Sequence, residues 1–487
     1  MIKEAYLGLD IGGTGVKAGV FNQKGALLGF SQRRVDPIVS AQGHADISIN
    51  LVYDAARASV REAVAQSGAR IAAMAVSSQG ETFVSLDEND QPLHAAILWY
   101  DSRAQLEADE LRRAVPLAAG RINPIYTVCK IKWLQAHFPK VMRKARRFLL
   151  LPDYFAYRLT GIPAIDVNTA LSTGLLTPDE DKYDPVILKA GGIDLSQLST
   201  ILIPGTPIGK VIRPMAEEWG LSPETLLVAG TNDQYAGALG AGNCRPGILS
   251  ETSGTCLAMV TLAKEKPKGL PAGLLSGRFP IPHSWFILAY SKTAGLVLDW
   301  FRREFFSSAS LEDMERLASA IPPGSDGLLA LPCFDGAFSP VPNPLARGAF
   351  YGLALRHTKA HLFRALLESL AYSLRENIEL MRGNGFPVDI IRSIGGGAKN
   401  SLWLQIKADV TGMNVEKPVV FEAAVLGAAM LAAVGNGGFK SLAESSAALY
   451  QPGRVFVPDK NNAQKYQSFY EGYRRLKAQL YGETNAP

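Results

Sequence analysis

The chain has 487 residues, of which 47% are hydrophobic and 20% charged, and its formal net charge is +5. This length exceeds one ordinary hydrophobic core and predicts two large domains or three small ones. Lys and Arg are dispersed among Asp and Glu, so the charge gives no indication of a nucleic-acid partner. No apolar run reaches the roughly 18 residues of a membrane span, and the N-terminus lacks a signal-peptide layout. Four widely spaced cysteines predict reduced thiols in a cytoplasmic protein.

The predicted elements alternate between strands and helices, which indicates α/β layers. The N-terminal part predicts strands at 5–10, 16–21 and 26–33, a helix at 50–67 and a buried strand at 71–79. The middle predicts a strand at 226–230, a small-residue helix at 235–242, and strands at 248–254 and 256–262. Residues 264–282 are rich in Pro and Gly and predict an irregular surface excursion. Helical patterns follow at 358–382, 402–412 and 423–434.

Two strand–turn–strand units, with glycine turns near residues 12–15 and 253–256, each open about half of the chain. This pairing predicts two related halves. Glycines let backbone N–H groups approach an anion closely, and a Thr hydroxyl adds a donor, so two such turns facing each other can hold a polyphosphate. Asp10, at the end of the leading strand, can orient Mg²⁺ through water. The spacing differs from both the dinucleotide fingerprint and the P-loop, and a glycine turn alone can simply reverse the chain.

An ordered series of segments resembles the FGGY family of carbohydrate kinases, which includes glycerol kinase and xylulokinase, within the actin-like, hexokinase-like ATPase superfamily. The likeness runs from about residue 5 to about residue 435. Its segments are residues 9–14 with Lys17, 99–103, 127–133, 153–161, 331–340, 348–368 and 395–400. Ile125 and the pair Ala337-Phe338 depart from the residues usual in the family.

The resemblance implies an α/β fold of two actin-like (ribonuclease H-like) domains with a catalytic cleft between them. Residues 1–243 would form the sugar-binding domain and residues 244–487 the ATP-binding domain. The implied cofactors are ATP and Mg²⁺, the implied partner is a small sugar or polyol, and a homodimer is left open.

Asp233 matches the family's catalytic carboxylate, which accepts the proton of the sugar hydroxyl as that hydroxyl attacks the γ-phosphate. The local sequence by itself favours a helix-capping carboxylate, and the two roles are compatible. The resemblance also implies that Asp10 and Asp233 hold Mg²⁺. The implied nucleotide contacts are Gly12, Gly13, Thr14, Lys17, Gly254, Thr255, Gly295, Gly395, Gly396, Gly397 and Asn400.

The sugar site implied by the resemblance is less sharply defined, and its residues are Gln79, Glu81, Trp99, Asp101, Asp233 and Gln234. Gly80 replaces the Arg of the Gln-Arg-Glu-Thr segment of glycerol kinase, and the Gln-Met-His-Gly pattern of D-xylulokinases is absent. The Ser-x-Gln-Gly beginning is closer to L-xylulose and erythritol kinases. Glu81 can accept two sugar hydroxyls. Trp99 would form an apolar wall for the sugar or belong to the core.

Three hypotheses follow. The first is a kinase of a ketopentose, and the second is a kinase of a polyol such as erythritol or glycerol, or of a sugar acid. The third, from another class, is a non-catalytic or chaperone-like actin-superfamily ATPase. Asp233 beside a hydroxyl-binding pocket argues against the third.

Overall fold

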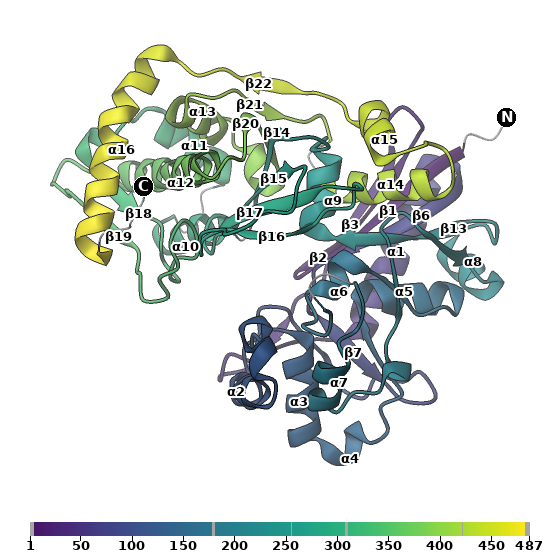
Figure 1. Cartoon of the computed structure of the whole chain (residues 1–487). Helices are drawn as coiled ribbons and strands as arrows, with labels where there is room; N and C mark the ends of the chain where they lie inside the picture. The colour runs from purple at the N-terminus through teal and green to yellow at the C-terminus, as the bar shows by residue number, and fades with distance from the viewer. Residues whose placement is uncertain (1–3, 178–180, 255, 307–309, 421, 483–487) are drawn as a thin grey trace. The chain divides into compact units, whose positions relative to one another are not determined.

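The computed structural model describes residues 4–177, 181–254, 256–306, 310–420 and 422–482 (Figure 1). The chain divides into two compact units: unit 1 contains residues 1–240 and 424–449, and unit 2 contains residues 241–423 and 450–487. The sequence predicted a single boundary after residue 243, whereas the packing returns a late segment to unit 1. This segment holds most of α14 (Ala423–Gly435) and all of α15 (Leu442–Leu449).

Small residues explain why α14 packs within unit 1. A Cβ placed on Gly8 would lie 1.8 Å from the carbonyl oxygen of Val425, and a Cβ on Gly427 would lie 1.8 Å from that of Ala236. Glycine at these positions therefore allows backbones to approach closely. Because α14 is almost entirely apolar and buried, it has no polar face that would show which unit it packs in, and the sequence pattern does not assign it to either.

Unit 1 is built on a six-stranded sheet with the order β12-β13-β6-β1-β2-β3. Strand β1 is parallel to β6, which is parallel to β13, while β2, β3 and β12 run antiparallel to their neighbours. The bounds are β1 Glu4–Gly12, β2 Gly15–Phe21, β3 Leu27–Arg34, β6 Arg70–Ser78, β12 Pro207–Lys210 and β13 Leu226–Asn232.

Unit 2 is built on a seven-stranded sheet with the order β16-β17-β15-β14-β20-β21-β22. Here β14 is parallel to β20, which is parallel to β21, and the other pairs are antiparallel. The strands β17-β15-β14-β20-β21 thus repeat the order and direction of β3-β2-β1-β6-β13, which confirms the predicted relation between the two halves. The bounds are β14 Gly247–Ser253, β15 Leu257–Ala263, β16 Leu275–Arg278, β17 Trp285–Ser291, β20 Val388–Ile394, β21 Val415–Lys417 and β22 Arg454–Phe456.

Smaller sheets and helices complete the units. A five-stranded sheet contains β4 (Ile38–Val39), β5 (Ala45–Ile47), β8 (Ala96–Ile97), β7 (Phe83–Leu86) and β9 (Arg147–Leu150). Two strand pairs are β10 (Ala164–Asp166) with β11 (Thr200–Leu202) and β18 (Leu329–Leu331) with β19 (Ala349–Tyr351). The other helices of unit 1 are α1 Ile49–Ser67, α2 Gln105–Ala114, α3 Thr127–His137, α4 Pro139–Met142, α5 Leu151–Thr160, α6 Val167–Leu171, α7 Pro185–Gly191, α8 Arg213–Trp219 and α9 Asp233–Gly240. Those of unit 2 are α10 Gly295–Phe305, α11 Leu311–Ser319, α12 Lys359–Gly383, α13 Ser401–Thr411 and α16 Lys460–Tyr481, and the 3₁₀ turns are η1 Pro116–Arg121, η2 Leu195–Gln197, η3 Ser325–Gly327 and η4 Gly396–Lys399.

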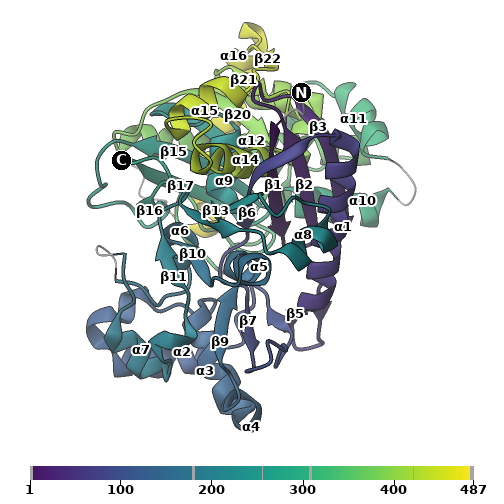
Figure 2. The same cartoon turned by 90° about the vertical axis from the view of Figure 1, so that its right-hand side faces the viewer.

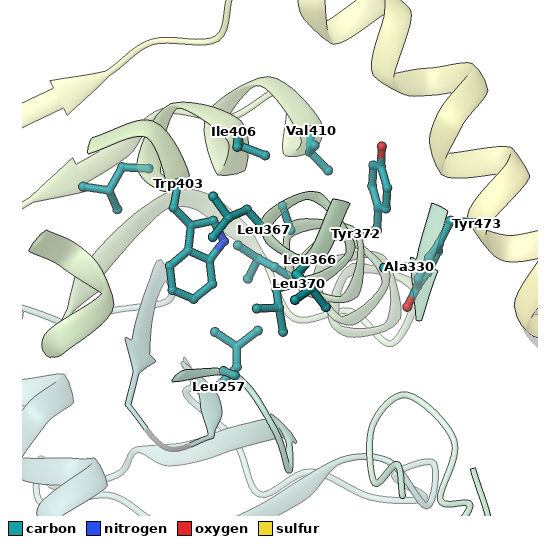
Figure 3. Packing of buried hydrophobic residues seen from close by; sticks show 14 of the residues in the cluster. Leu257, Ala330, Leu366, Leu367, Leu370, Tyr372, Trp403, Ile406, Val410 and Tyr473 are labelled. Atoms are coloured by element: carbon teal, nitrogen blue, oxygen red, sulfur yellow. The ribbon is translucent and has the colours of Figure 1, made fainter. Parts of the chain in front are cut away.

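Each unit has its own hydrophobic core. In unit 1, α1 lies along β2 and β3, with its apolar face buried and its N-terminus capped by the Ser48 hydroxyl (Figure 2). In unit 2, Trp403 of α13 packs with Leu366 and Leu367 of α12 and with Leu257 of β15 (Figure 3). These cores form because the predicted strands and helices bury their apolar faces against one another.

The predicted elements occur within a few residues of their expected positions, with one difference. The stretch 264–282, predicted to be irregular, contains the short strand β16, which pairs with part of β17. None of the helices in the part of the chain that the structure describes is both long and apolar enough to cross a bilayer.

Unit 1 buries two carboxyl groups close to each other. Asp153, in the first turn of α5, is 2% exposed and accepts a hydrogen bond from the Ser199 hydroxyl. Burial raises the pKa of Asp153 to about 8, and the neighbouring Asp166 adds to the increase. In an unfolded chain this pKa lies near 4, so between about pH 4 and pH 8 the folded state keeps a proton that the unfolded state releases. This group therefore lowers the free energy of unfolding as the pH rises through that range.

Replacing Asp153 by Asn should remove this pH-dependent penalty. We expect the free energy of unfolding of Asp153→Asn to exceed that of the wild type by about 1–3 kcal/mol at pH 8, and the difference to shrink toward pH 4. Urea unfolding at several pH values measures it, with Asp299→Asn, at an exposed carboxylate, as the control. A variant that is less stable than the wild type at pH 8 would contradict the assignment.

Candidate active site

The ends of three parallel strands bring the predicted acidic residues together in unit 1. Asp10 on β1 lies beside Ser77 on β6, and Ser77 lies beside Thr231 on β13. Asp233 follows two residues after Thr231, as the first residue of α9. The Ser77 hydroxyl donates a hydrogen bond of 3.0 Å to Oδ1 of Asp10. The carboxyl edge of parallel strands is where α/β proteins place ligand sites, and this edge carries both carboxylates.

Asp233 has the electrostatic properties of a base that works near neutral pH. Burial and, to a smaller extent, the Asp10 carboxylate raise its pKa to about 7, while Gln234 and Lys17 oppose the increase. Its side chain nevertheless remains partly accessible. The capping contact at the start of this helix is made by Asn232, whose Oδ1 accepts a hydrogen bond of 3.0 Å from the Gln234 N–H. Asp233 is therefore a partly accessible carboxylate that can either hold or release a proton.

The side chain of Gln79 lies near the first glycine turn. Its side chain is 4% exposed, and neither atom of its amide has a hydrogen-bond partner among the described residues. A Cβ on Gly13 would lie 3.1 Å from Oε1 of Gln79 and 3.7 Å from Nε1 of Trp99, so both side chains approach the first glycine turn. Buried amides are normally paired, so this unpaired amide is a candidate contact for a polar ligand. Trp99 is 37% exposed, which excludes the core alternative.

Two hydroxyl groups fix the peptide of Glu81. This residue has φ = 51°, in the left-handed region that non-glycine residues rarely adopt. Its N–H donates to Oγ of Ser172 at 3.2 Å, and its carbonyl accepts a hydrogen bond of 3.2 Å from the Thr127 hydroxyl. Strained backbone of this kind is found at functional sites, where the surrounding structure holds it in place.

A buried lysine faces Glu81. Burial raises the pKa of Glu81, and the charge of Lys130 on α3 opposes this increase. The Lys130 ammonium donates to the carbonyl oxygens of Leu98 at 2.7 Å and Trp99 at 3.2 Å. Lys130 thereby holds the Trp99 segment, and its charge favours the ionised form of Glu81. The family-like segment 127–133 contains this lysine, but the sequence did not show that Lys130 contacts the Trp99 segment.

Gly80 is required for space. A Cβ at this position would lie 2.7 Å from Oγ and 3.1 Å from Cβ of Ser172. A side chain here would displace the hydroxyl that accepts from the Glu81 N–H. Nothing in the local sequence of Ser172 indicates this role.

Asp101 differs from the sequence prediction of a sugar contact. Its carboxylate accepts hydrogen bonds from the N–H of Ala45, and from the backbone, Nε and Nη2 of Arg103. These bonds use the acceptor positions of a carboxylate, and the side chain is 1% exposed. Asp101 therefore holds the loop after Trp99, and we leave it out of the proposed sugar contacts.

The predicted nucleotide loops of unit 2 lie close together. The Gly295 N–H donates to the Gly254 carbonyl at 2.8 Å, and Gly395, with φ = 75°, lies against Thr252 and Ser253. A Cβ on Gly397 would lie 2.2 Å from Cβ of Ser253. Thr255 lies outside the described residues.

The other predicted nucleotide contacts lie in their expected loops. Gly12, Gly13 and Thr14 form the turn between β1 and β2, and Lys17 lies opposite Asp10 across this strand pair. Asn400 caps α13 by accepting the Trp403 N–H at 2.8 Å. Their contacts with a nucleotide stay predictions.

Two carboxylates fit the magnesium ion that the family implies. No cluster of three or more His, Cys, Asp or Glu side chains suited to a metal occurs in the described ranges. Mg²⁺ with a nucleotide is typically bound through one or two carboxylates, water and the phosphates, so Asp10 and Asp233 are a suitable pair.

Comparison with known proteins agrees with this geometry. Residues 5–240 match the N-terminal domain of the FGGY family of carbohydrate kinases, and residues 250–435 match its C-terminal domain. The chain belongs to the FGGY family. It is therefore a phosphotransferase that uses ATP and acts on a sugar hydroxyl.

Its relatives cover nearly the whole chain. A xylulose kinase of Bacillus subtilis (strain 168) is 30% identical, and the match covers 96% of each chain. The L-xylulose/3-keto-L-gulonate kinase of Escherichia coli (strain K12) is 27% identical over 98% of this chain and 97% of its own. The crystal structure of a xylulose kinase from Rhodospirillum rubrum matches with a TM-score of 0.86 at 26% identity, covering 98% of this chain and 99% of its own. The predicted α/β fold of FGGY kinases is confirmed.

Removing either member of the Gly80–Ser172 contact should have the same effect. Both Ser172→Ala and Gly80→Ala take the hydroxyl away from the Glu81 N–H, so we expect each to lower kcat/KM for the sugar about three- to tenfold, the value of one hydrogen bond. The double variant should be no worse than either single variant, because both changes remove the same bond. Steady-state kinetics measure this, with Gly120→Ala as the control because a Cβ there meets nothing within 4 Å. Multiplicative losses in the double variant would show that the two residues act separately.

Proposed function

We propose that this kinase phosphorylates a ketopentose, with Asp233 as the general base. The observation that carries the proposal is the position of Asp233 beside Asp10 at the carboxyl edge of β1, β6 and β13, with its pKa raised to about 7 by burial. A base of this pKa is mostly ionised at the pH of metabolism and still basic enough to receive a proton. The ketopentose is supported by relatives named xylulose kinase and by the Gln79-Gly80-Glu81 segment.

In the proposed reaction, Gln79 and Glu81 bind sugar hydroxyls while Trp99 contacts the apolar face of the sugar. Asp233 receives the proton of the acceptor hydroxyl as its oxygen forms a bond to the γ-phosphorus of ATP. The bond between that phosphorus and the oxygen bridging to the β-phosphate breaks, and ADP leaves with the electron pair. Gln234, next to Asp233, is proposed to contact the sugar as well.

Asp10 and Asp233 would hold Mg²⁺, which when bound supplies positive charge to the phosphates. Gly12, Gly13, Thr14 and Lys17 are proposed to contact the β- and γ-phosphates. In unit 2 the proposed nucleotide contacts are Gly254, Gly295, Gly395, Gly396, Gly397 and Asn400. The use of ATP as donor is in keeping with a cytoplasmic enzyme, and a homodimer stays an open prediction.

A sugar acid is a less suitable substrate than a neutral ketose. Its carboxylate would lie near Glu81 and Asp233, and the negative charge of Asp233 already raises the pKa of Glu81. The nearby Lys130 ammonium is fully buried and bound to backbone carbonyls. Like charges in poorly screened surroundings repel, so a neutral polyhydroxyl ligand is favoured.

A substrate panel tests the proposal directly. Release of ADP is measured with D-xylulose, L-xylulose, D-ribulose, erythritol, glycerol and gluconate. We expect kcat/KM for a pentulose to exceed that for glycerol or gluconate at least about tenfold, because hydrogen-bonding sites discriminate strongly among hydroxyl patterns. Preference for gluconate or a polyol would replace the ketopentose, and ATP hydrolysis without stimulation by any carbohydrate would favour the non-kinase ATPase.

The variant Asp233→Asn tests the base. We expect kcat to fall about 10²- to 10⁴-fold while the sugar still binds, because the amide keeps the shape of the side chain but cannot take the proton. Coupled kinetics and calorimetric titration of the sugar measure the two effects.

The pH profile is the accompanying control. Since Asp233 must be ionised, kcat/KM of the wild type should decline below about pH 7 and level off above it, and the residual activity of the variant should lack this limb. Turnover of Asp233→Asn near that of the wild type would exclude Asp233 as the base.

A further inference from the structure

Unit 2 contains an ion pair that is completely buried. The Lys407 ammonium on α13 lies 2.8 Å from a carboxylate oxygen of Glu251 on β14, and both side chains are 0% exposed. The Ser393 and Ser253 hydroxyls donate to the same carboxylate, and the Lys407 ammonium contacts Ser253 Oγ at 2.9 Å. Removing two charges from water is costly, so a pair of this kind needs a reason beyond stability.

The pair lies directly beneath the predicted nucleotide loops. Ser253, which both charged groups bind, precedes Gly254, whose backbone is exposed. The Ser253 side chain also supports the second loop, because the backbone of Gly397 packs so closely on it that a Cβ would lie 2.2 Å away. The Trp403 ring lies 3.9 Å from the Lys407 ammonium and would lie 2.7 Å from the same added Cβ. One buried group of contacts therefore connects Lys407 to both loops.

The repeat of the fold shows what Glu251 corresponds to. Asp10 in β1 lies beside Ser77 of the neighbouring parallel strand and accepts its hydroxyl. Glu251 in β14 lies beside Ser393 of the neighbouring parallel strand and accepts its hydroxyl in the same way. Each carboxylate stands two residues before the end of its strand. Glu251 thus occupies the position in unit 2 that Asp10 occupies in unit 1.

The negative charges of Asp10 and Glu251 have different surroundings in the two units. Asp10 contributes negative charge to the surroundings of Asp233 and raises its pKa. Glu251 is paired with Lys407. Burial lowers the pKa of Lys407, and the Glu251 carboxylate opposes this decrease. A bare carboxylate under the Ser253-Gly254 turn would repel an anionic ligand above it.

We propose that the Lys407–Glu251 pair is a positioning element for nucleotide binding: it anchors Ser253, holds the Ser253-Gly254 turn against the Gly395–Gly397 loop, and removes negative charge from beneath them. The inference rests on the proposed function, in which these loops bind the nucleotide. Lys407 and Glu251 do not touch the ligand and act through Ser253.

The test compares two buried ion pairs of the same unit. Lys407→Met breaks the first pair, and Arg364→Met breaks the pair of Arg364 with Glu368 on α12, which lies 2.8 Å apart and is 6% and 2% exposed. The Arg364 guanidinium donates hydrogen bonds to Glu368 and Tyr466, which lie outside the glycine loops. Thermal unfolding, the Kd of ADP and the Kd of the preferred sugar are measured for each full-length variant.

We expect Lys407→Met to raise the Kd of ADP about tenfold or more, since small displacements of binding groups weaken binding strongly. The Kd of the sugar should change less than about twofold, because the proposed sugar contacts belong to unit 1, whereas Lys407 and its partners Glu251 and Ser253 belong to unit 2. Arg364→Met should lower the melting temperature but leave the Kd of ADP within about twofold, since it only destabilises the unit.

A milder variant keeps the test decisive if Lys407→Met does not fold. Ser253→Ala removes only the hydroxyl that joins the turn to the pair, and it should also raise the Kd of ADP, with the Kd of the sugar unchanged. An unchanged Kd of ADP in the folded variants, or an equal increase in Arg364→Met, would overturn the inference and leave the proposed function intact. If the wild type binds no ADP, the proposed nucleotide site and this inference fail together.

Discussion

The chemistry that we propose for this chain depends on two carboxylates held close together where water screens them poorly. Asp10 and Asp233 come from strands that share one edge of a sheet, and burial together with their mutual repulsion raises the pKa of Asp233 to about 7. A carboxylate in water would be a much weaker base. Lys17, on the strand paired with β1, opposes this increase, so the pKa of Asp233 stays near neutral and the carboxylate can still ionise. The order of the strands thus contributes to the raised pKa of the carboxylate that we propose as the base.

The second sheet repeats this arrangement and uses it for another purpose. Both sheets place a carboxylate two residues before a turn and beside a serine of the neighbouring parallel strand. In unit 1 the carboxylate remains part of the site, whereas in unit 2 Lys407 from α13 neutralises it completely. A site that binds a polyphosphate needs few negative charges of its own, while a site that activates a hydroxyl needs one. At this position the two halves therefore differ mainly in Lys407, which neutralises the carboxylate of unit 2.

Much of the fold could be predicted because many of its strands are apolar runs that end in turns. Asp10 was selected from its place at such a strand end, whereas Asp233 was selected from the family resemblance, since its local sequence favours a helix cap. The missing parts are contacts between distant residues. The hydrogen bonds of Glu81 join it to residues 46 and 91 positions away, and Lys407 lies 156 positions from Glu251. Periodicity carries no information on such pairs. Strand β16 was missed because its stability comes from pairing with β17, and the assignment of α14 to unit 1 depends on Gly8 and Gly427. The sequence also did not show that Arg103 and the Ala45 N–H occupy the Asp101 carboxylate.

The proposed sugar site depends on a steric relation between two distant residues, Gly80 and Ser172. Gly80 has no left-handed φ, so glycine is needed there only because Ser172 fills the space that a side chain would occupy. The arginine of glycerol kinase could enter this position only if Ser172 moved. Moving Ser172 would release the N–H of Glu81, whose φ of 51° depends on being held from both sides. An arginine at position 80 therefore requires a change at position 172 as well, and the proposed contact of Glu81 with a sugar depends on the glycine and the Ser172 hydroxyl together.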